Sequence, residues 1–459
     1  MSVSLPPELW LRIFSEATAT PGLLDSDSEF TSDLPIAWVR QQERRTIKDS
    51  LQTKRALVLV CKDWNSLASE FLYQSILITR VDALRPLLKS LKASAMRSST
   101  TSTPTSSDPD SSTPTQESNA HSVPHGFWTR RLDVTIQEDR CEAAHYDLLA
   151  QVIGHLRSLA VFTLAVPMLP FNDVWIRHVP VAVLDALVRT SADSLRVFDC
   201  AESILRPSRN DLMLLLSATR NLRVLRCPIC SPTPGDKYAA SRAEVPLMPS
   251  LESLSLMSVF VNDYLPRSLP SSPSPSSSSS PSATPAPVPE PRRTPYPMLR
   301  QLSYDSIPPP FYDTRWNTFL SQHCANITSV RIDFSLPAYS LQREFDLLEE
   351  HCPRLSKIAI TFVTWETMKP NFVLPGTVRE LALCCKVQVP PPAHVRALLL
   401  ALKSLRGGKL EMVRLCCGVF VRELRENHGE KLREAGEVLK KRGGAFRVED
   451  EEGGLLIPL

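Results

Sequence analysis

The sequence predicts an α/β protein, with a small all-helical module at the N-terminus and an irregular solenoid after it, in which a curved parallel sheet is backed by helices. Two observations predict this fold class. The first eighty residues show the apolar spacing of amphipathic helices, and from residue 126 onward short apolar strands alternate with helical stretches at a period in the high twenties. The length of 459 residues suits two to three domains and a sizeable core.

The composition disfavours several classes of function. Lys and Arg number 52 and Asp and Glu 49, so the net charge of +3 is too balanced to indicate a nucleic-acid or membrane-surface partner. Glycine is scarce, with 14 residues against 40 prolines, which leaves few places where backbone amides could approach a phosphate. A nucleotide-binding enzyme is therefore disfavoured.

The location of the protein is predicted from its N-terminus and its cysteines. The segment MSVSLPPELWLRIF has no basic region and reaches Glu8 before an apolar run develops, so no signal peptide is expected. No stretch approaches the roughly 18–20 apolar residues of a membrane span. The eleven cysteines are spread along the chain, which favours reduced thiols in the cytoplasm or nucleus over a disulfide framework.

Two segments of low complexity interrupt the chain. Ser, Thr and Pro supply 19 of the 27 residues from 98 to 124 and 23 of the 32 from 266 to 297. Both are expected to be disordered, the first as a linker over residues 98–125 and the second as an insertion over 266–297. They are passive spacers, or they carry proline-directed phosphorylation sites. The Ser-Pro and Thr-Pro pairs concerned begin at Thr103, Thr113, Ser272, Ser274, Ser280, Thr284 and Thr294.

Two helical patterns make up the N-terminal module. Proline and Glu8 suit a first helical turn, and Leu9, Ile13 and Ala17 recur at i, i+4 and i+8. The second pattern comprises Leu57, Val60, Cys61, Trp64, Leu67, Ala68 and Phe71. Residues 21–50 between them show no clean periodicity until Thr46, and we expect an insertion that loops out. A core of this size usually needs a partner or a neighbouring domain.

The module contains three motifs in a fixed order: Leu5-Pro6-x-Glu8-Leu9, the pair Ile13-Phe14, and Val60-Cys61-Lys62-x-Trp64 followed by Leu67-Ala68. In order and residue type they resemble the F-box, the module by which substrate receptors attach to the Skp adaptor of Skp–cullin–F-box ubiquitin ligases. The resemblance implies an F-box over residues 1–80 with an insertion at about 21–50. Because this insertion separates the motifs by more chain than is usual, the identity of the middle helix stays open.

The resemblance also implies a set of adaptor-binding residues, since the family's apolar motif residues contact the adaptor and the core of the module itself. The candidates are Leu5, Pro6, Leu9, Ile13, Val60 and Trp64. For each of them the alternative is that it closes a small helical core and contacts no partner.

The remainder of the chain repeats the motif L-x-x-L-x-L with apolar substitutions. Its copies are Leu156-Leu159-Val161, Leu195-Phe198-Cys200, Leu222-Leu225-Cys227, Leu251-Leu254-Leu256, Leu299-Leu302-Tyr304, Ile327-Val330-Ile332, Leu355-Ile358-Ile360, Val378-Leu381-Leu383 and Leu410-Val413-Leu415, with Leu132 and Val134 as a partial first copy. This pattern resembles leucine-rich repeats, although the asparagine that usually follows the strand is missing. The resemblance implies a repeat domain over residues 126–433, whose units bury their core by stacking, and a charged tail over 434–459.

The open face of the predicted sheet is a candidate surface for a partner. Because side chains alternate along a strand, the residue between the last two motif positions should point to this face. These residues are Asp133, Ala160, Asp199, Arg226, Ser255, Ser303, Arg331, Ala359, Ala382 and Arg414. The family binds partners there, so Arg226, Arg331 and Arg414 are candidates for a substrate surface that suits an acidic or phosphorylated protein. The alternative is that they are ordinary solvated charges.

Motifs of catalysis and metal binding are missing from the sequence. GxGxxG, GxxxxGK[ST], HExxH and GxSxG do not occur, and the single CxxC, Cys227-Pro-Ile-Cys230, lacks the second pair that a zinc site requires. We therefore expect no catalytic residue, no cofactor and no metal.

The expected function is that of a non-catalytic substrate-recognition subunit of a ubiquitin ligase complex. Its partners would be the Skp adaptor, through it the cullin scaffold, and an unknown target protein, with no nucleic acid and no membrane. Two alternatives stay open. One is a leucine-rich-repeat scaffold for protein interactions that is not coupled to ubiquitination, and the other is an enzyme with an unrecognised cysteine nucleophile.

Overall fold

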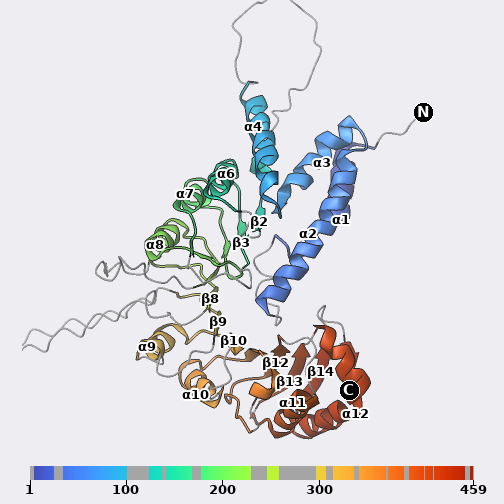
Figure 1. The fold of residues 1–459 in the computed structure, drawn as a ribbon, viewed down its shortest axis with the longest axis vertical. Coiled ribbons are helices and arrows are strands. Elements are labelled where there is room, and N and C mark those ends of the chain that lie inside the picture. Colours follow the sequence, from blue (N-terminus) through green and yellow to red (C-terminus); the bar gives the residue numbers. More distant parts are fainter. Residues whose placement is uncertain are drawn as a thin grey trace, which may run out of the picture. The chain divides into compact units, whose positions relative to one another are not determined.

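The computed structural model describes most of the chain outside its low-complexity segments. The described residues are 5–24, 35–100, 123–136, 141–167, 177–228, 246–257, 296–305, 314–334, 341–368, 371–386, 392–407, 409–416, 418–449 and 455–457. Most of the two segments predicted to be disordered lies outside these residues, as do all seven Ser-Pro and Thr-Pro pairs. The chain forms two compact units, unit 1 with residues 1–29 and 39–222 and unit 2 with residues 30–38 and 223–459 (Figure 1).

Three helices form the N-terminal module. They are α1 (Pro7–Thr18), α2 (Ile36–Val58) and α3 (Lys62–Gln74). Phe14 of α1, Val58 of α2 and Ala68 of α3 are buried against one another and make the centre of a small apolar cluster. Cys61 caps the start of α3, because its Sγ accepts a hydrogen bond from the backbone N–H of Trp64 at 3.4 Å.

The second half of the expected insertion is helical rather than a loop. Residues 36–50 belong to α2, which runs from Ile36 to Val58 without a glycine or proline. Apolar periodicity does not reveal this helix, because its buried side chains include charged ones. The buried residues of α2 are Arg40, Ile47, Lys54 and Val58.

Unit 1 has a parallel sheet with the strand order β1, β2, β3, β5. These strands are Ser75–Ile78, Arg131–Thr135, Val161–Ala165 and Val197–Asp199, and a separate pair is formed by β4 (Arg177–His178) and β6 (Leu205–Arg206). The helices are α4 (Leu84–Thr100), α5 (His125–Trp128), α6 (Ala143–Ile153), α7 (Val181–Ser191) and α8 (Arg209–Ala218), and a short 3-10 turn is at Val81–Ala83. Figure 1 shows α6 and α7 on one side of β2 and β3 and α2 on the other.

The strand register corrects one predicted copy of the motif. Phe162 of β3, rather than Leu159, aligns with the middle motif residues of β2 and β5. Because apolar residues stand at positions 156, 159 and 162, the motif fits the sequence in two registers three residues apart. The residue of β3 on the open face is consequently Thr163 and not Ala160.

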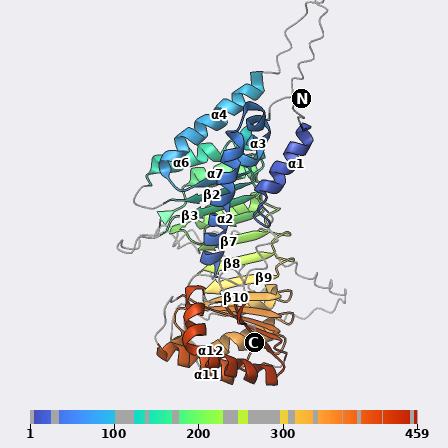
Figure 2. The same cartoon turned by 90° about the vertical axis from the view of Figure 1, so that its right-hand side faces the viewer.

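Unit 2 continues the same pattern with parallel strands from β7 to β14, followed by an antiparallel β15. Its strands are β7 (Val224–Pro228), β8 (Ser253–Met257), β9 (Gln301–Asp305), β10 (Ser329–Phe334), β11 (Lys357–Phe362), β12 (Glu380–Cys385), β13 (Met412–Cys416), β14 (Ala445–Glu449) and β15 (Leu455–Ile457). Its helices are α9 (Thr314–His323), α10 (Leu341–His351), α11 (Pro392–Ser404) and α12 (Gly418–Lys441), with a 3-10 turn at Trp365–Thr367. Figure 2 shows β7 to β10 side by side.

The register of unit 2 confirms the predicted spacing of its repeats. The middle motif residues pair from each strand to the next, and they are Leu225, Leu254, Leu302, Val330, Ile358, Leu381 and Val413. All seven are buried, so one continuous apolar row runs through the unit. The α/β class, with parallel strands backed by helices, is therefore as predicted.

The parallel strands extend beyond the predicted repeat region at both ends. Ile76 on β1, within the first eighty residues, aligns with the middle motif residue of β2. Phe446 on β14, within the expected charged tail, aligns with that of β13. Tyr73 and Gly443 stand where the motif has its first leucine, which is why a search for L-x-x-L-x-L misses both strands.

Glu344 of α10 is a buried carboxyl group in unit 2, with 1% of its surface exposed. Its Oε2 accepts a hydrogen bond from the Tyr304 hydroxyl at 3.1 Å, and its Oε1 has no hydrogen-bond partner among the described residues. The Tyr304 ring packs against Trp316, with 5.0 Å between the ring centroids. Burial raises the pKa of Glu344 to about 7, although the hydrogen bond from Tyr304 opposes the shift.

The raised pKa of Glu344 should make the stability of unit 2 depend on pH. Between about pH 4.5 and 7 the folded state keeps a proton that the unfolded chain releases, so the free energy of unfolding falls as the pH rises, by up to about 3 kcal/mol. Glu344→Gln should remove this contribution. Glu350→Gln, at a side chain 70% exposed on the same helix, should leave it in place.

Urea unfolding of the wild type and both variants at about pH 5 and about pH 7.5 measures this difference. Other titrating groups contribute equally to all three proteins, so the comparison isolates Glu344. The same pH dependence in the wild type and in Glu344→Gln would contradict the assignment.

Candidate functional site

Helix α1 has two apolar faces with opposite environments. Phe14 is fully buried, and the ring of Trp10 stacks on it with 5.8 Å between the centroids. Leu5, just before the helix, and Leu9 and Ile13 within it follow one another at i, i+4 and i+8 and are 37%, 46% and 45% exposed. The second face is therefore an apolar stripe that the described residues leave open to solvent.

The turn between α2 and α3 exposes two further apolar residues. Leu59 and Val60 are 81% and 59% exposed, directly after the buried Val58. Backbone hydrogen bonds from their N–H groups to the carbonyls of Ala56 and Leu57 hold the turn at the end of the helix. Two large apolar side chains held in water contribute nothing to folding stability, so they indicate a contact surface.

Most of the residues predicted to bind the adaptor lie on these surfaces. Leu5, Pro6, Leu9, Ile13 and Val60 are exposed. Trp64 is only partly exposed and packs on the rings of Trp10 and Phe14 at 4.7 and 4.8 Å, so it belongs mainly to the core of the module.

Leu59 was not predicted as a site residue, although it is the most exposed of the group. It lies between Leu57 and Val60 of the second helical pattern, at a position outside the apolar spacing, and α2 ends one residue earlier. We call Leu5, Leu9, Ile13, Leu59 and Val60 the exposed apolar set.

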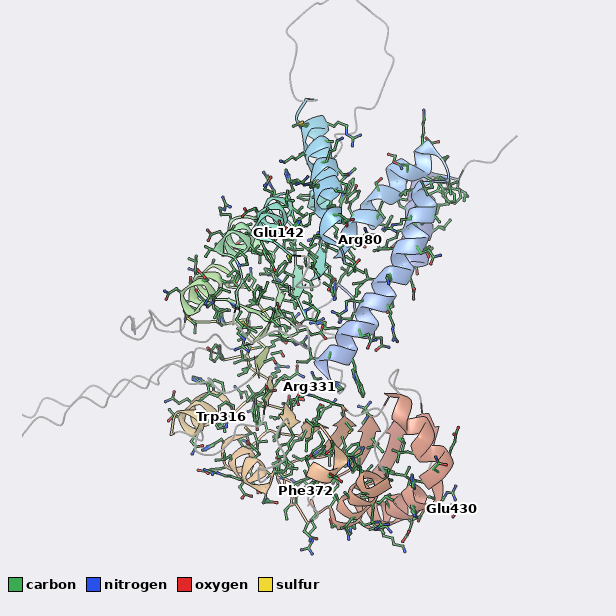
Figure 3. All side chains as sticks on the ribbon, viewed as in Figure 1. Arg80, Glu142, Trp316, Arg331, Phe372 and Glu430 are labelled. Carbon is green, nitrogen blue, oxygen red and sulfur yellow. The ribbon has the colours of Figure 1, made fainter. Side chains whose placement is uncertain are left out.

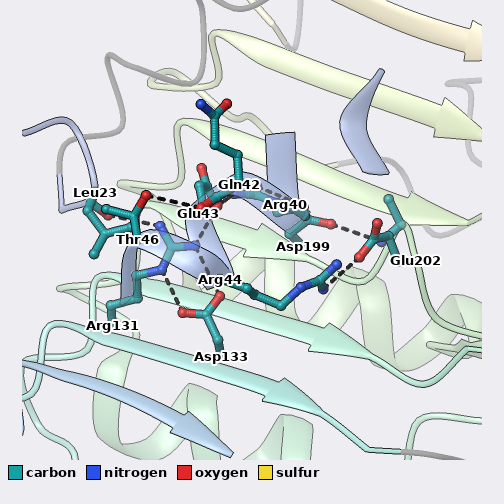
Figure 4. A network of polar contacts seen from close by, with 11 residues as sticks. Leu23, Arg40, Gln42, Glu43, Arg44, Thr46, Arg131, Asp133, Asp199 and Glu202 are labelled. Atoms are coloured by element: carbon teal, nitrogen blue, oxygen red, sulfur yellow. Dashed lines mark hydrogen bonds and ion pairs between the residues drawn. The ribbon is translucent and has the colours of Figure 1, made fainter. Parts of the chain in front are cut away.

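A second cluster joins α2 to the open face of the sheet in unit 1 (Figure 4). The register places Asp133, Thr163 and Asp199 in one row across β2, β3 and β5. Arg40 of α2 donates from Nε and Nη2 to Oδ2 of Asp199, at 2.8 and 2.5 Å. Both side chains are 2% exposed, so the ion pair is almost completely withdrawn from water.

Glu43 lies at the centre of this cluster because two cations share its carboxylate. Arg40 Nη1 and Arg131 Nη2 both donate to Glu43 Oε2, at 2.5 and 2.6 Å. Arg131 also donates to both oxygens of Asp133, at 2.6 and 3.0 Å, and to the carbonyl of Leu23 at 2.9 Å. Burial alone would lower the pKa of the Arg131 guanidinium, but the carboxylates of Asp133 and Glu43 outweigh this effect and raise it.

Arg44, one turn further along α2, makes the outermost pair. Its Nη1 donates to Glu202 Oε2 at 2.8 Å, and the two side chains are 23% and 21% exposed. Burial raises the pKa of the Glu202 carboxyl, and the guanidinium of Arg44 opposes the shift. We call Arg40, Glu43, Arg44, Arg131, Asp133, Asp199 and Glu202 the ion-pair network.

The predicted substrate surface is largely closed in this structure. Arg226 and Arg331 are 4% and 7% exposed, and Arg414 is half-buried, so the first two do not present their guanidinium groups to a partner. The alternation along the strands holds, and Arg331, labelled in Figure 3, aligns with the short side chains of Ser303 and Ala359 on the neighbouring strands, which leave room for its long stem. The prediction assumed that a side chain on the open face is exposed, and for Arg226 and Arg331 this assumption is wrong.

Two cysteines at helix ends, Cys324 and Cys352, are core residues and fully buried. His323 beside Cys324 is 6% exposed between Tyr296 and Phe319, and burial lowers its pKa to about 4.

No protein-family model matches this chain, and no curated protein matches it either. In the described part of the chain no helix has both the length and the apolar character needed to cross a bilayer. The same residues contain no group of three or more His, Cys, Asp or Glu side chains placed to hold a metal ion. The function is therefore argued from the exposed apolar set and the ion-pair network.

The two faces of α1 predict opposite effects of truncation. Phe14→Ala should lower the free energy of unfolding by about 3–5 kcal/mol, because it empties the centre of the module. Leu9→Ala, on the open face, should change it by less than about 0.5 kcal/mol. Urea unfolding followed by circular dichroism checks both, and a comparable loss in the two variants would mean that Leu9 is part of the core.

Proposed function

We propose that this protein is a non-catalytic substrate receptor of a Skp–cullin–F-box ubiquitin ligase, with residues 1–80 as its F-box. The observation that supports this best is the exposed apolar set. The module buries Phe14 and Val58 at its centre yet leaves Leu9, Ile13 and Val60 in water, at the positions where the F-box resemblance implies adaptor contacts. Large apolar side chains held on rigid helices are suited to an interface with another protein.

The mechanism is proximity. The adaptor would hold the helical module, and the repeat-like units, which resemble leucine-rich repeats, would hold a target protein near the ubiquitin-charged enzyme of the ligase. Holding both raises the effective concentration of the target, and no bond chemistry takes place in this chain.

Charged substitutions in the exposed apolar set should weaken binding to the adaptor. Leu9→Asp combined with Ile13→Asp places two charges in the proposed interface and should weaken binding by at least about 30-fold, the equivalent of a hot-spot loss of about 2 kcal/mol. Co-purification with the Skp adaptor and the cullin scaffold, followed by titration calorimetry with the adaptor, measures the effect.

The matched control is Leu214→Asp on α8, because Leu214 is an exposed leucine in the same unit, 49% exposed. This variant should bind like the wild type. Equal binding by the double variant would show that the exposed apolar set is not the interface. Failure of the folded wild-type chain to bind would favour the alternative, a leucine-rich-repeat scaffold that is not coupled to ubiquitination.

A further inference from the structure

Helix α2 connects the helical module to the sheet of unit 1 over a long distance. Its C-terminal end carries Val58, which is buried against Phe14 of the module. Its N-terminal half carries Arg40, which is paired with Asp199 on β5. The two residues are 18 positions apart in an unbroken helix, which at 1.5 Å per residue is about 27 Å.

The end of α3 is attached to unit 1 as well, through α4, α5 and the residue before β2. The Tyr73 hydroxyl lies 2.7 Å from Ser90 Oγ, its ring stacks on His125 at 4.4 Å, and the Arg130 N–H donates to the carbonyl of Gln74 at 2.9 Å. An attachment at one point leaves a rigid body free to turn about it. The ion pairs of Arg40, Glu43 and Arg44 are the distant attachments that set its direction, and the pair of Arg40 with Asp199 is the most deeply buried of them.

Ion pairs, more than apolar packing, hold the N-terminal half of α2. Within residues 36–46, all described, Arg40 is the one buried side chain. Its partner is fixed in turn, because Asp199 Oδ1 accepts the N–H of Ala201 at 2.9 Å. A buried, hydrogen-bonded pair of this kind contributes little net stability compared with apolar packing, but it accepts few other geometries.

We infer that Arg40 is a positioning residue that fixes the direction of α2 on the sheet, and with it the place where the exposed apolar set is presented. The role as a receptor rests on the proposed function, whereas the fixed direction does not. A change of about 20° in the direction of α2 would displace its far end by about 9 Å. For a receptor that acts by proximity, this displacement separates target and enzyme.

The experiment measures the distance between the module and the sheet in the full-length chain. Ser15 on α1 and Val181 on α7, both exposed and both in unit 1, are replaced by amino acids that carry a ketone. Spin labels are attached to the ketones by a reaction that leaves the native thiols unmodified. Pulsed electron paramagnetic resonance gives the distribution of distances. The wild type should show one narrow distribution, and Arg40→Ala should broaden it at least twofold.

Three variants separate direction from stability. Arg45→Ala removes the same charge from an exposed position of the same helix and should keep the narrow distribution. Arg40→Lys retains a cation and should restore most of the narrowness. Glu43→Gln removes one carboxylate charge from the ion-pair network and should also broaden the distance distribution. It is the variant to measure if Arg40→Ala does not fold.

An unchanged width in folded Arg40→Ala would overturn the inference. Adaptor binding is measured on the same samples, and it should stay at the wild-type level in Arg40→Ala, because Arg40 is not in the exposed apolar set. If the wild type shows a narrow distance distribution but does not bind the adaptor, the proposed function alone is refuted. If the wild type binds the adaptor but shows a broad distance distribution, the positioning role alone is refuted.

Discussion

Each strand of this protein can bury its apolar row only if its neighbour lies in the same register. Leu302, for example, is flanked by Leu254 on one side and Val330 on the other, and all three are buried. This parallel stacking also determines which residues meet on the open face of the sheet, because the residues between the apolar positions are aligned in rows as well. The row of Asp133, Thr163 and Asp199 arises in this way, and it supplies the carboxylates on which α2 lies.

The position of α2 follows from charge more than from hydropathy. Arg40, Ile47 and Lys54 follow one another at intervals of seven residues, and with Val58 they are the four buried residues of the helix, two of which are cations. Such a helix would not be stable alone on apolar burial. It is held where acidic side chains stand on the sheet, and a charge in this contact that stayed buried without its partner would carry a large desolvation cost.

The sequence predicts the repeated part of the fold better than the parts that interact across it. Strands with an L-x-x-L-x-L pattern were placed correctly in unit 2, where most copies fit the sequence in only one register. The copy at Leu159 was misplaced by three residues, because Phe162 fits equally well. The bounds of the middle helix stayed open because Arg40 and Lys54 occupy buried positions of α2, and the burial of Arg226 and Arg331 depends on neighbours far away in the sequence. Leu9 and Val60 were predicted as adaptor contacts from their type and spacing, and the structure leaves both exposed, as such a contact requires.

The candidate site inverts the usual distribution of side chains. Arg40, Arg131 and Asp199 are withdrawn from water, while Leu9 and Leu59 are left in it. Either choice lowers the stability of an isolated chain, since a buried charge loses hydration and an exposed leucine loses the gain from burial. The buried ion pairs lie in the N-terminal half of α2, and the exposed Leu59 and Val60 follow its C-terminal end. In the proposed receptor, the apolar surface for the adaptor has to stay uncovered, and α2 is held from its other end by contacts that need no apolar surface.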